Sequence, residues 1–85
     1  MQLARVIGQA VATVKHPSYR GWRLLLLQLL AADGGDDGEP ILALDQLGAG
    51  PGSRVIACND GAEARKLVGA ADSPARWFVL GICDG

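Results

Sequence analysis

The chain has 85 residues, of which 49% are hydrophobic, and this size and composition predict one small domain spanning residues 1–85. Eight Lys and Arg residues nearly balance nine Asp and Glu residues, which gives a net charge of −1 and excludes the basic surface that nucleic-acid binding requires. Aromatic residues make up only 5% of the chain, too few for a platform on which bases stack.

The first third of the chain predicts two strands separated by a turn. Residues 3–14 are rich in β-forming and small side chains that alternate with a period near two. A turn rich in Pro, Ser and Gly follows at 16–21. Residues 22–30 are apolar on both faces except at Arg23 and Gln28, which indicates a strand covered on both sides. Since so short a chain has little to cover the second face, we expect a neighbouring subunit to lie there.

The apolar run at residues 24–32 imitates part of a secretory signal, because Lys15, Arg20 and Arg23 precede it. The run is far shorter than the roughly 20 residues that cross a bilayer. The residues before it predict a strand and not a short basic leader. We therefore expect a soluble cytoplasmic protein with no membrane partner.

An acidic, Gly-rich hairpin loop is predicted at residues 32–40. Residues 41–47 and 53–58 alternate in the manner of strands on either side of a second loop that is rich in glycine. This glycine loop therefore joins two strands.

A short helix is predicted over residues 61–68, because Asp60 and Glu63 form a capping pair at its start. Residues 77–83 are apolar and predict a last strand. The order β-β-β-β-α-β predicts a mostly β protein: a small OB-like antiparallel β-barrel with one short helix before the last strand.

The glycine loop, "DQLGAGPGSRV" at residues 45–55, has the appearance of a phosphate-binding loop. Loops that bind dinucleotides or triphosphates lead into a helix, and the second kind also needs a Lys followed by Ser or Thr. This stretch has no lysine and leads into a strand, so we predict no nucleotide cofactor. Asp45 is expected to hold backbone N–H groups of the loop or an arginine, with Arg54 as the candidate.

No constellation of catalytic or metal-binding residues is recognisable. The single histidine, His16, precedes a proline in a turn, and a nucleophilic pair with Cys58 or Cys83 would need an orienting group and a cleft. Both cysteines are expected to be buried apolar thiols. The acidic stretch at 33–37 lacks the twelve-residue calcium-loop pattern. We therefore predict no catalytic, cofactor-binding or metal-binding residue, and assembly rather than chemistry.

Three stretches carry a resemblance to a known family: "ARVIGQAVATVKHPSYRGWRLLLLQLL", "LALDQLGAGPGSRVIACNDGAEARKL" and "VLGICD". In order and spacing they resemble the pentameric vertex proteins of bacterial microcompartments, the EutN/CcmL family. The most specific piece is Asp-x-x-Gly-Ala-Gly-x-Gly-x-x-Val at residues 45–55.

The resemblance implies an OB-like barrel protomer that assembles into a homopentamer. Such rings occupy the vertices of a polyhedral shell in the bacterial cytoplasm, next to hexameric shell proteins that form the flat facets, and they are not enzymes. Tight packing around a five-fold axis leaves little room for side chains, which suits the glycine loop. The candidates for a subunit-interface or pore loop are Asp45, Gly48, Ala49, Gly50, Gly52 and Arg54.

Two other functions remain as alternatives. An OB-type binding module for single-stranded nucleic acid or a small ligand would show salt-dependent binding, which the neutral charge opposes. A cysteine-dependent enzyme would have a thiol that a probe labels quickly in the folded state, whereas we expect slow labelling of both cysteines.

Overall fold

The computed structural model describes residues 1–9, 22–71 and 75–83. The predicted element order β-β-β-β-α-β is confirmed. Of the predicted first strand, residues 10–14 lie outside the described residues, as does the predicted turn at 16–21. The elements are β1 (Gln2–Gln9), β2 (Arg23–Leu29), β3 (Ile41–Asp45), β4 (Arg54–Asn59), α1 (Gly61–Val68) and β5 (Trp77–Cys83).

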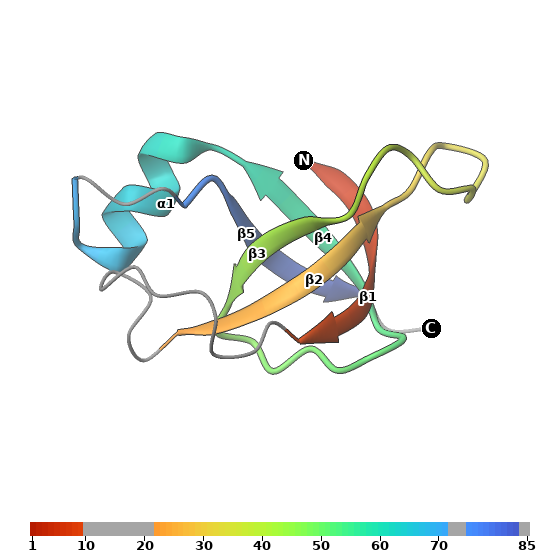
Figure 1. Ribbon diagram of the computed structural model, residues 1–85, viewed down its shortest axis with the longest axis horizontal. Helices are drawn as coiled ribbons and strands as arrows, with labels where there is room; N and C mark the ends of the chain where they lie inside the picture. The colour runs from red at the N-terminus through yellow and green to blue at the C-terminus, as the bar shows by residue number, and fades with distance from the viewer. Residues whose placement is uncertain (10–21, 72–74, 84–85) are drawn as a thin grey trace.

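The five strands close into a barrel in the order β1-β2-β3-β5-β4, with β4 returning to β1 (Figure 1). Four neighbouring pairs are antiparallel, and the OB-like barrel is confirmed. The fifth pair, β3 with β5, is parallel, with Leu44 opposite Phe78. The parallel pair follows from α1, because the helix carries the chain across the barrel end so that β5 enters between β3 and β4.

The barrel interior is filled by aliphatic side chains that alternate along the strands. Small residues are frequent among them, as a narrow barrel requires when its interior is packed without a channel. The interior cluster comprises Ala4, Val6, Leu25, Leu27, Ala43, Ala49, Val55, Ala57 and Val79.

A second buried cluster lies outside the barrel wall, between the wall and α1. Leu24 and Leu44 belong to this cluster with Ala64 of the helix, and Phe78 packs against it. The chain itself therefore covers the outer face of β2 at this end. The expectation that a neighbouring subunit must cover the second face is wrong at Leu24.

The other end of β2 is covered by the acidic hairpin. Gln28 is only 6% exposed, and its Nε2 donates hydrogen bonds to the carbonyl oxygens of Leu29 (3.1 Å) and Gly38 (3.0 Å). Residues 32–40 are exposed, and the hairpin is held by a bridge between Leu30 and Asp36, which confirms the predicted loop. The remaining outward side chain of β2, Leu26, lies between the two covered ends and is half-buried.

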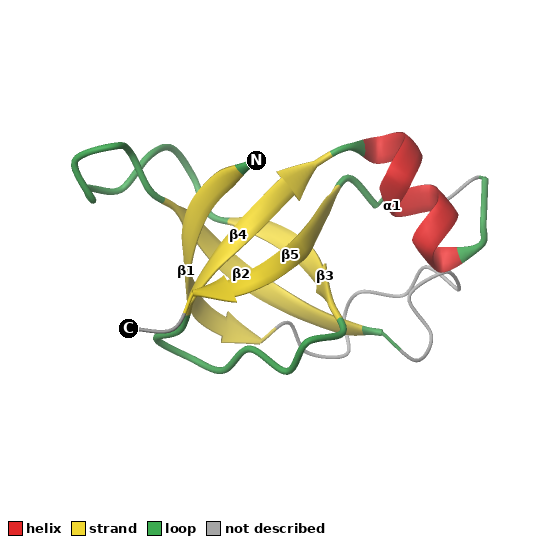
Figure 2. Ribbon diagram, turned by 180° about the vertical axis from the view of Figure 1, so that it is seen from behind, coloured by secondary structure: helices red, strands yellow, loops and turns green. Residues whose placement is uncertain are grey.

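The predicted helix is confirmed, but only the Asp60 half of the predicted capping pair forms, because the Asp60 N–H donates to Arg76 and not to the Glu63 side chain. Asp60 is the N-cap, and its Oδ1 accepts a hydrogen bond from the Glu63 backbone N–H (3.1 Å). The Asp60 N–H donates to the carbonyl of Arg76, and the Glu63 carboxylate lies beside Lys66. Gly69 ends the helix with φ of +69°, in the left-handed region where glycine is unstrained. The helix and the acidic hairpin lie at opposite ends of the molecule in both views (Figures 1 and 2).

No helix in the described part of the chain is both long and apolar enough to cross a membrane.

Candidate functional site

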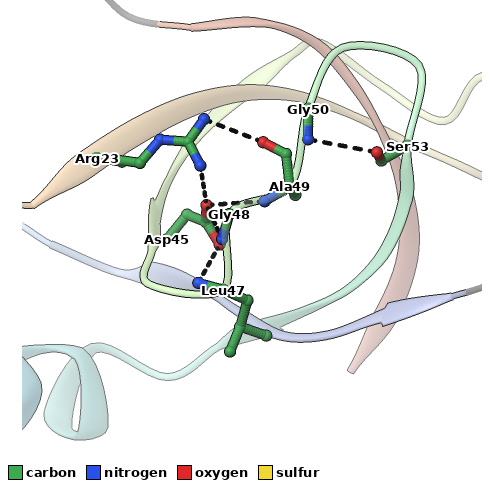
Figure 3. Close-up of polar contacts among 7 residues, drawn as sticks. All are labelled: Arg23, Asp45, Leu47, Gly48, Ala49, Gly50 and Ser53. Carbon is green, nitrogen blue, oxygen red and sulfur yellow. Dashed lines mark hydrogen bonds and ion pairs between the residues drawn. The ribbon is translucent and has the colours of Figure 1, made fainter.

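The glycine loop is organised around the carboxylate of Asp45. Asp45 ends β3 and is only 1% exposed, so its charge must be matched within the chain. Its Oδ1 accepts from the Leu47 N–H (3.0 Å), while Oδ2 accepts from the N–H groups of Gly48 (3.1 Å) and Ala49 (3.2 Å) (Figure 3). The prediction that Asp45 holds loop backbone N–H groups is confirmed.

The arginine that pairs with this carboxylate is Arg23. The expectation that Arg54 would do so is wrong. Arg23 begins β2 and lies opposite Asp45 in the β2–β3 ladder. Its Nη1 donates to Oδ2 of Asp45 over 2.9 Å, and its Nη2 donates to the carbonyl of Ala49 over 3.1 Å. Arg54 is an exposed residue at the start of β4. One guanidinium therefore ties the end of a strand to the middle of the loop.

The second half of the loop is fastened to itself and to β1. The Gly50 N–H donates to Oγ of Ser53 (3.3 Å), and the Ser53 N–H donates to the Gly50 carbonyl (3.0 Å). The Gly52 N–H donates to the Val6 carbonyl, and the Val6 N–H donates to the Ser53 carbonyl. Together with the Asp45 contacts, these bonds engage the six backbone N–H groups of residues 47–50, 52 and 53. A phosphate cradle needs such groups to be free, so this loop has the wrong chemistry for one.

Two glycines of the loop adopt a backbone that other residues avoid. Gly48 has φ of +85° and Gly52 has φ of +83°, both in the left-handed region. Gly50 has no such φ, and a Cβ built on it would meet nothing within 4 Å. The side chain of Ala49 is buried in the barrel interior. Gly48 and Gly52 thus give the loop its shape, and the buried side chain of Ala49 holds it against the barrel. Neither the backbone conformation nor packing within the chain requires a glycine at position 50.

The structure brings three of the six predicted site residues into one network, while Gly50 and Gly52 bond to Ser53 and Val6 and Arg54 is exposed. Asp45, Gly48 and Ala49 share one hydrogen-bonded network with Arg23, which the sequence analysis missed. The hairpin bounds alone could not have found Arg23, because a symmetric loop at 32–40 would place Leu27 opposite Asp45, whereas the observed register pairs Leu27 with Ile41 and Arg23 with Asp45.

The other polar groups of the described residues are not gathered into a reactive centre. Cys58 is half-buried, whereas Cys83 at the end of β5 is exposed, so the expectation of a buried thiol is wrong for Cys83. Residues 1–9, 22–71 and 75–83 contain no group of three or more His, Cys, Asp or Glu side chains that could hold a metal ion. His16 lies outside the described residues.

The fold and the loop define a class: a small closed barrel of the OB type whose glycine loop is braced from within by an arginine and an aspartate. Residues 1–84 match the family model described as "Ethanolamine utilisation protein EutN/carboxysome". The chain belongs to this EutN/CcmL family.

Similar proteins cover almost the whole chain. It is 38% identical to the bacterial microcompartment shell vertex protein EutN of Salmonella typhimurium, over 99% of this chain and 84% of that protein. It is 40% identical to the carboxysome shell vertex protein CcmL of a Synechocystis species, over 99% of this chain and 83% of that protein. The solved GrpN pentameric microcompartment shell protein from Rhodospirillum rubrum has a TM-score of 0.81 at 33% identity, covering 100% of this chain and 95% of that chain.

Proposed function

We propose that this chain is a structural subunit of a pentameric vertex in a bacterial microcompartment shell, and that it acts within the bacterial cytoplasm as one domain over residues 1–85. The observation that carries this proposal is the family match over residues 1–84, together with relatives named shell vertex proteins and a solved relative named pentameric.

A vertex role has a geometric reason. Flat sheets of hexameric units cannot close into a polyhedron, so a shell needs five-fold units where curvature is concentrated. The partners of this chain are therefore four further copies in its own ring and hexameric shell proteins around the ring. Each subunit of such a ring presents one patch to the neighbour on one side and a different patch to the neighbour on the other.

The proposed role is structural and not enzymatic, and it uses no cofactor, nucleic acid or membrane. The backbone N–H groups of the glycine loop are already hydrogen-bonded within the chain, which supports the absence of an anionic cofactor such as a nucleotide there. The balanced charge of the chain supports it for nucleic acids.

The glycine loop is proposed as a contact with a neighbouring chain, at the subunit interface or at the central opening of the ring. The bracing by Asp45 and Arg23 fixes the loop before assembly, which lowers the entropy lost on contact. Gly50 supports the proposal because a close approach by another chain would explain a glycine that its own chain does not require. The surface candidates are Gly48, Gly50, Gly52 and Arg54, while Asp45 and Ala49 support the loop from below.

Sedimentation velocity and native mass spectrometry of the purified chain test the function. The expected species is a pentamer, with no retention of single-stranded DNA or RNA at low salt. A stable monomer at micromolar concentration contradicts the proposed ring. Salt-dependent binding of single strands would favour the OB-type binding module instead.

A further inference from the structure

Two arginine side chains converge at the start of α1. A Cβ built on Gly61, the first residue of the helix, would lie 3.0 Å from Nη1 of Arg65 and 3.8 Å from Nη1 of Arg76. The two guanidinium groups therefore lie close together, over a position where a missing side chain gives them room. Arg65 is half-buried on the helix, whereas Arg76 is exposed just before β5.

Nothing in the described residues neutralises this arginine pair. Arginine keeps its charge at physiological pH, so two guanidinium groups at close range repel each other. Within the part of the chain that the structure describes, neither of them forms an ion pair or donates a hydrogen bond. The acidic side chains at the start of α1 are engaged elsewhere: Asp60 accepts from the Glu63 N–H, and the Glu63 carboxylate pairs with Lys66. The donors of the arginine pair are thus available to an anion.

A hollow of about 300 Å³ adjoins the arginine pair, and Arg76 is one of its lining residues. The hollow lies between the starts of β3 and β5, which pair at a single position, Leu44 with Phe78, so that the barrel wall is open ahead of this position. The other lining residues are all apolar; among them Leu42 is 43% exposed and Trp77 is half-buried. The hollow is therefore apolar, with a positive charge beside it.

The two features together select a class of ligand. Guanidinium groups bind carboxylates and phosphates through paired hydrogen bonds. Phosphate esters mostly carry polar bodies such as sugars, which leucine and tryptophan side chains do not match, whereas a hydrocarbon chain gains free energy when it is buried beside them. A volume near 300 Å³ is at the lower limit of small-molecule sites and has room for a short chain or one ring.

We propose that Arg65, Arg76 and the hollow form a binding site for a small carboxylate with an apolar body. The carboxylate lies between the two guanidinium groups, and the hydrocarbon part lies in the hollow against Leu42 and Trp77. All the residues of the site belong to one chain, so this inference goes beyond the proposed ring and does not depend on it.

Hexanoate is a suitable probe, because it combines a carboxylate with a short alkyl chain. We expect a titration followed by NMR at constant ionic strength, through the Gly61 amide and the Trp77 indole N–H, to give a dissociation constant of about 1–10 mM. Acetate lacks the alkyl chain and hexanol lacks the charge, so each should bind at least about tenfold more weakly.

Four substitutions test the residues of the site. Arg65→Ala and Arg76→Ala should each raise the dissociation constant of hexanoate about tenfold, since each removes half of the partners of the carboxylate. Gly61→Ala should act in the same direction, because the new methyl group displaces the Arg65 guanidinium while alanine favours the helix. Leu42→Ser should weaken hexanoate about fivefold and leave the weaker binding of acetate unchanged. Arg54→Ala is the matched control, since Arg54 is an exposed arginine at the opposite end of β4 from α1 and should leave the dissociation constant unchanged.

The NMR spectrum of each variant shows that it is folded before binding is compared. Saturable shifts at both Gly61 and Trp77 that weaken in the arginine variants but not in Arg54→Ala support the site. The absence of a saturable shift well above the expected constant overturns it, as does an equal loss in Arg54→Ala. Acetate binding as tightly as hexanoate would contradict the role of the hollow, and hexanol binding as tightly would contradict the role of the arginine pair. None of these outcomes depends on whether the chain forms a ring, so the proposed function is tested separately.

Discussion

Arg23 and Asp45 lie opposite each other in the β2–β3 ladder, and Nη1 of Arg23 donates a hydrogen bond to Oδ2 of Asp45 over 2.9 Å. The Asp45 side chain is fully buried, whereas 39% of the Arg23 side chain is exposed. Because Nη2 of the same guanidinium reaches the carbonyl of Ala49, the pair closes the base of the glycine loop. Arg23 therefore fixes the first half of the loop to the barrel strands β2 and β3.

Removal of Arg23 should destabilise the barrel. Arg23→Ala leaves the buried carboxylate with its three backbone donors but without its ionic partner, and we expect a loss of about 2 kcal/mol in the free energy of unfolding. The measurement is urea unfolding at one fixed chain concentration, since assembly adds to apparent stability. Arg76→Ala is a matched control: Arg76 is exposed, lies outside the glycine loop and should change stability by less than about 0.5 kcal/mol. An equal loss in both variants would contradict the role given to Arg23.

Replacing Asp45 with asparagine should cost more than replacing Arg23. The carboxylate accepts four hydrogen bonds, and an amide of the same shape turns one acceptor into a donor that faces other donors. Buried groups left without partners cost about 1–3 kcal/mol each. The same unfolding measurement, run on Asp45→Asn and Arg23→Ala together, checks the order. A smaller loss for Asp45→Asn would mean that a buried carboxylate left without its counter-charge costs more than the disturbed backbone contacts.

The secondary structure was predictable because its signals are local. Strand alternation, the hairpin at 32–40 and the Asp60 cap all lie within a few neighbouring residues, and each was found where expected. The partner of Asp45 depends on the register of two strands separated by a hairpin, so proximity in the sequence favours Arg54 whereas the register selects Arg23. The register of β2 against β3 is what the sequence alone does not reveal about this pair.

The covering of β2 was harder to predict for a related reason. An apolar strand indicates that both faces are covered but not by what. Leu24 is covered by α1, which follows much later in the chain, and Gln28 by the hairpin. Both contacts arise from the barrel closing, including its one parallel pair, and closure is not encoded in any single segment.

The two central glycines of the loop should respond differently to valine. Gly48 has φ of +85°, where a β-branched residue is strained, so Gly48→Val should lower the stability of the barrel by about 1–3 kcal/mol. Gly50 is free of that constraint, so Gly50→Val should change the stability by less than about 0.5 kcal/mol while weakening assembly. Thermal unfolding at a dilution where the chain is monomeric, and sedimentation velocity at a concentration that favours the ring, separate the two effects. Rings of normal stability in Gly50→Val would remove the loop from the list of assembly contacts.

The two thiols should also differ in reactivity. Cys83 is exposed at the end of β5, whereas Cys58 is half-buried in β4 opposite Phe78. The exposure of Cys83 replaces the slow labelling expected for it from the sequence: a maleimide probe should label Cys83 at a rate near that of a free thiol and Cys58 more slowly, since access limits the reaction. Mass spectrometry of timed samples checks this, with Cys83→Ser as the control that isolates Cys58. Protection of Cys83 at concentrations that favour the ring, with rapid labelling on dilution, would place the end of β5 in a contact between subunits.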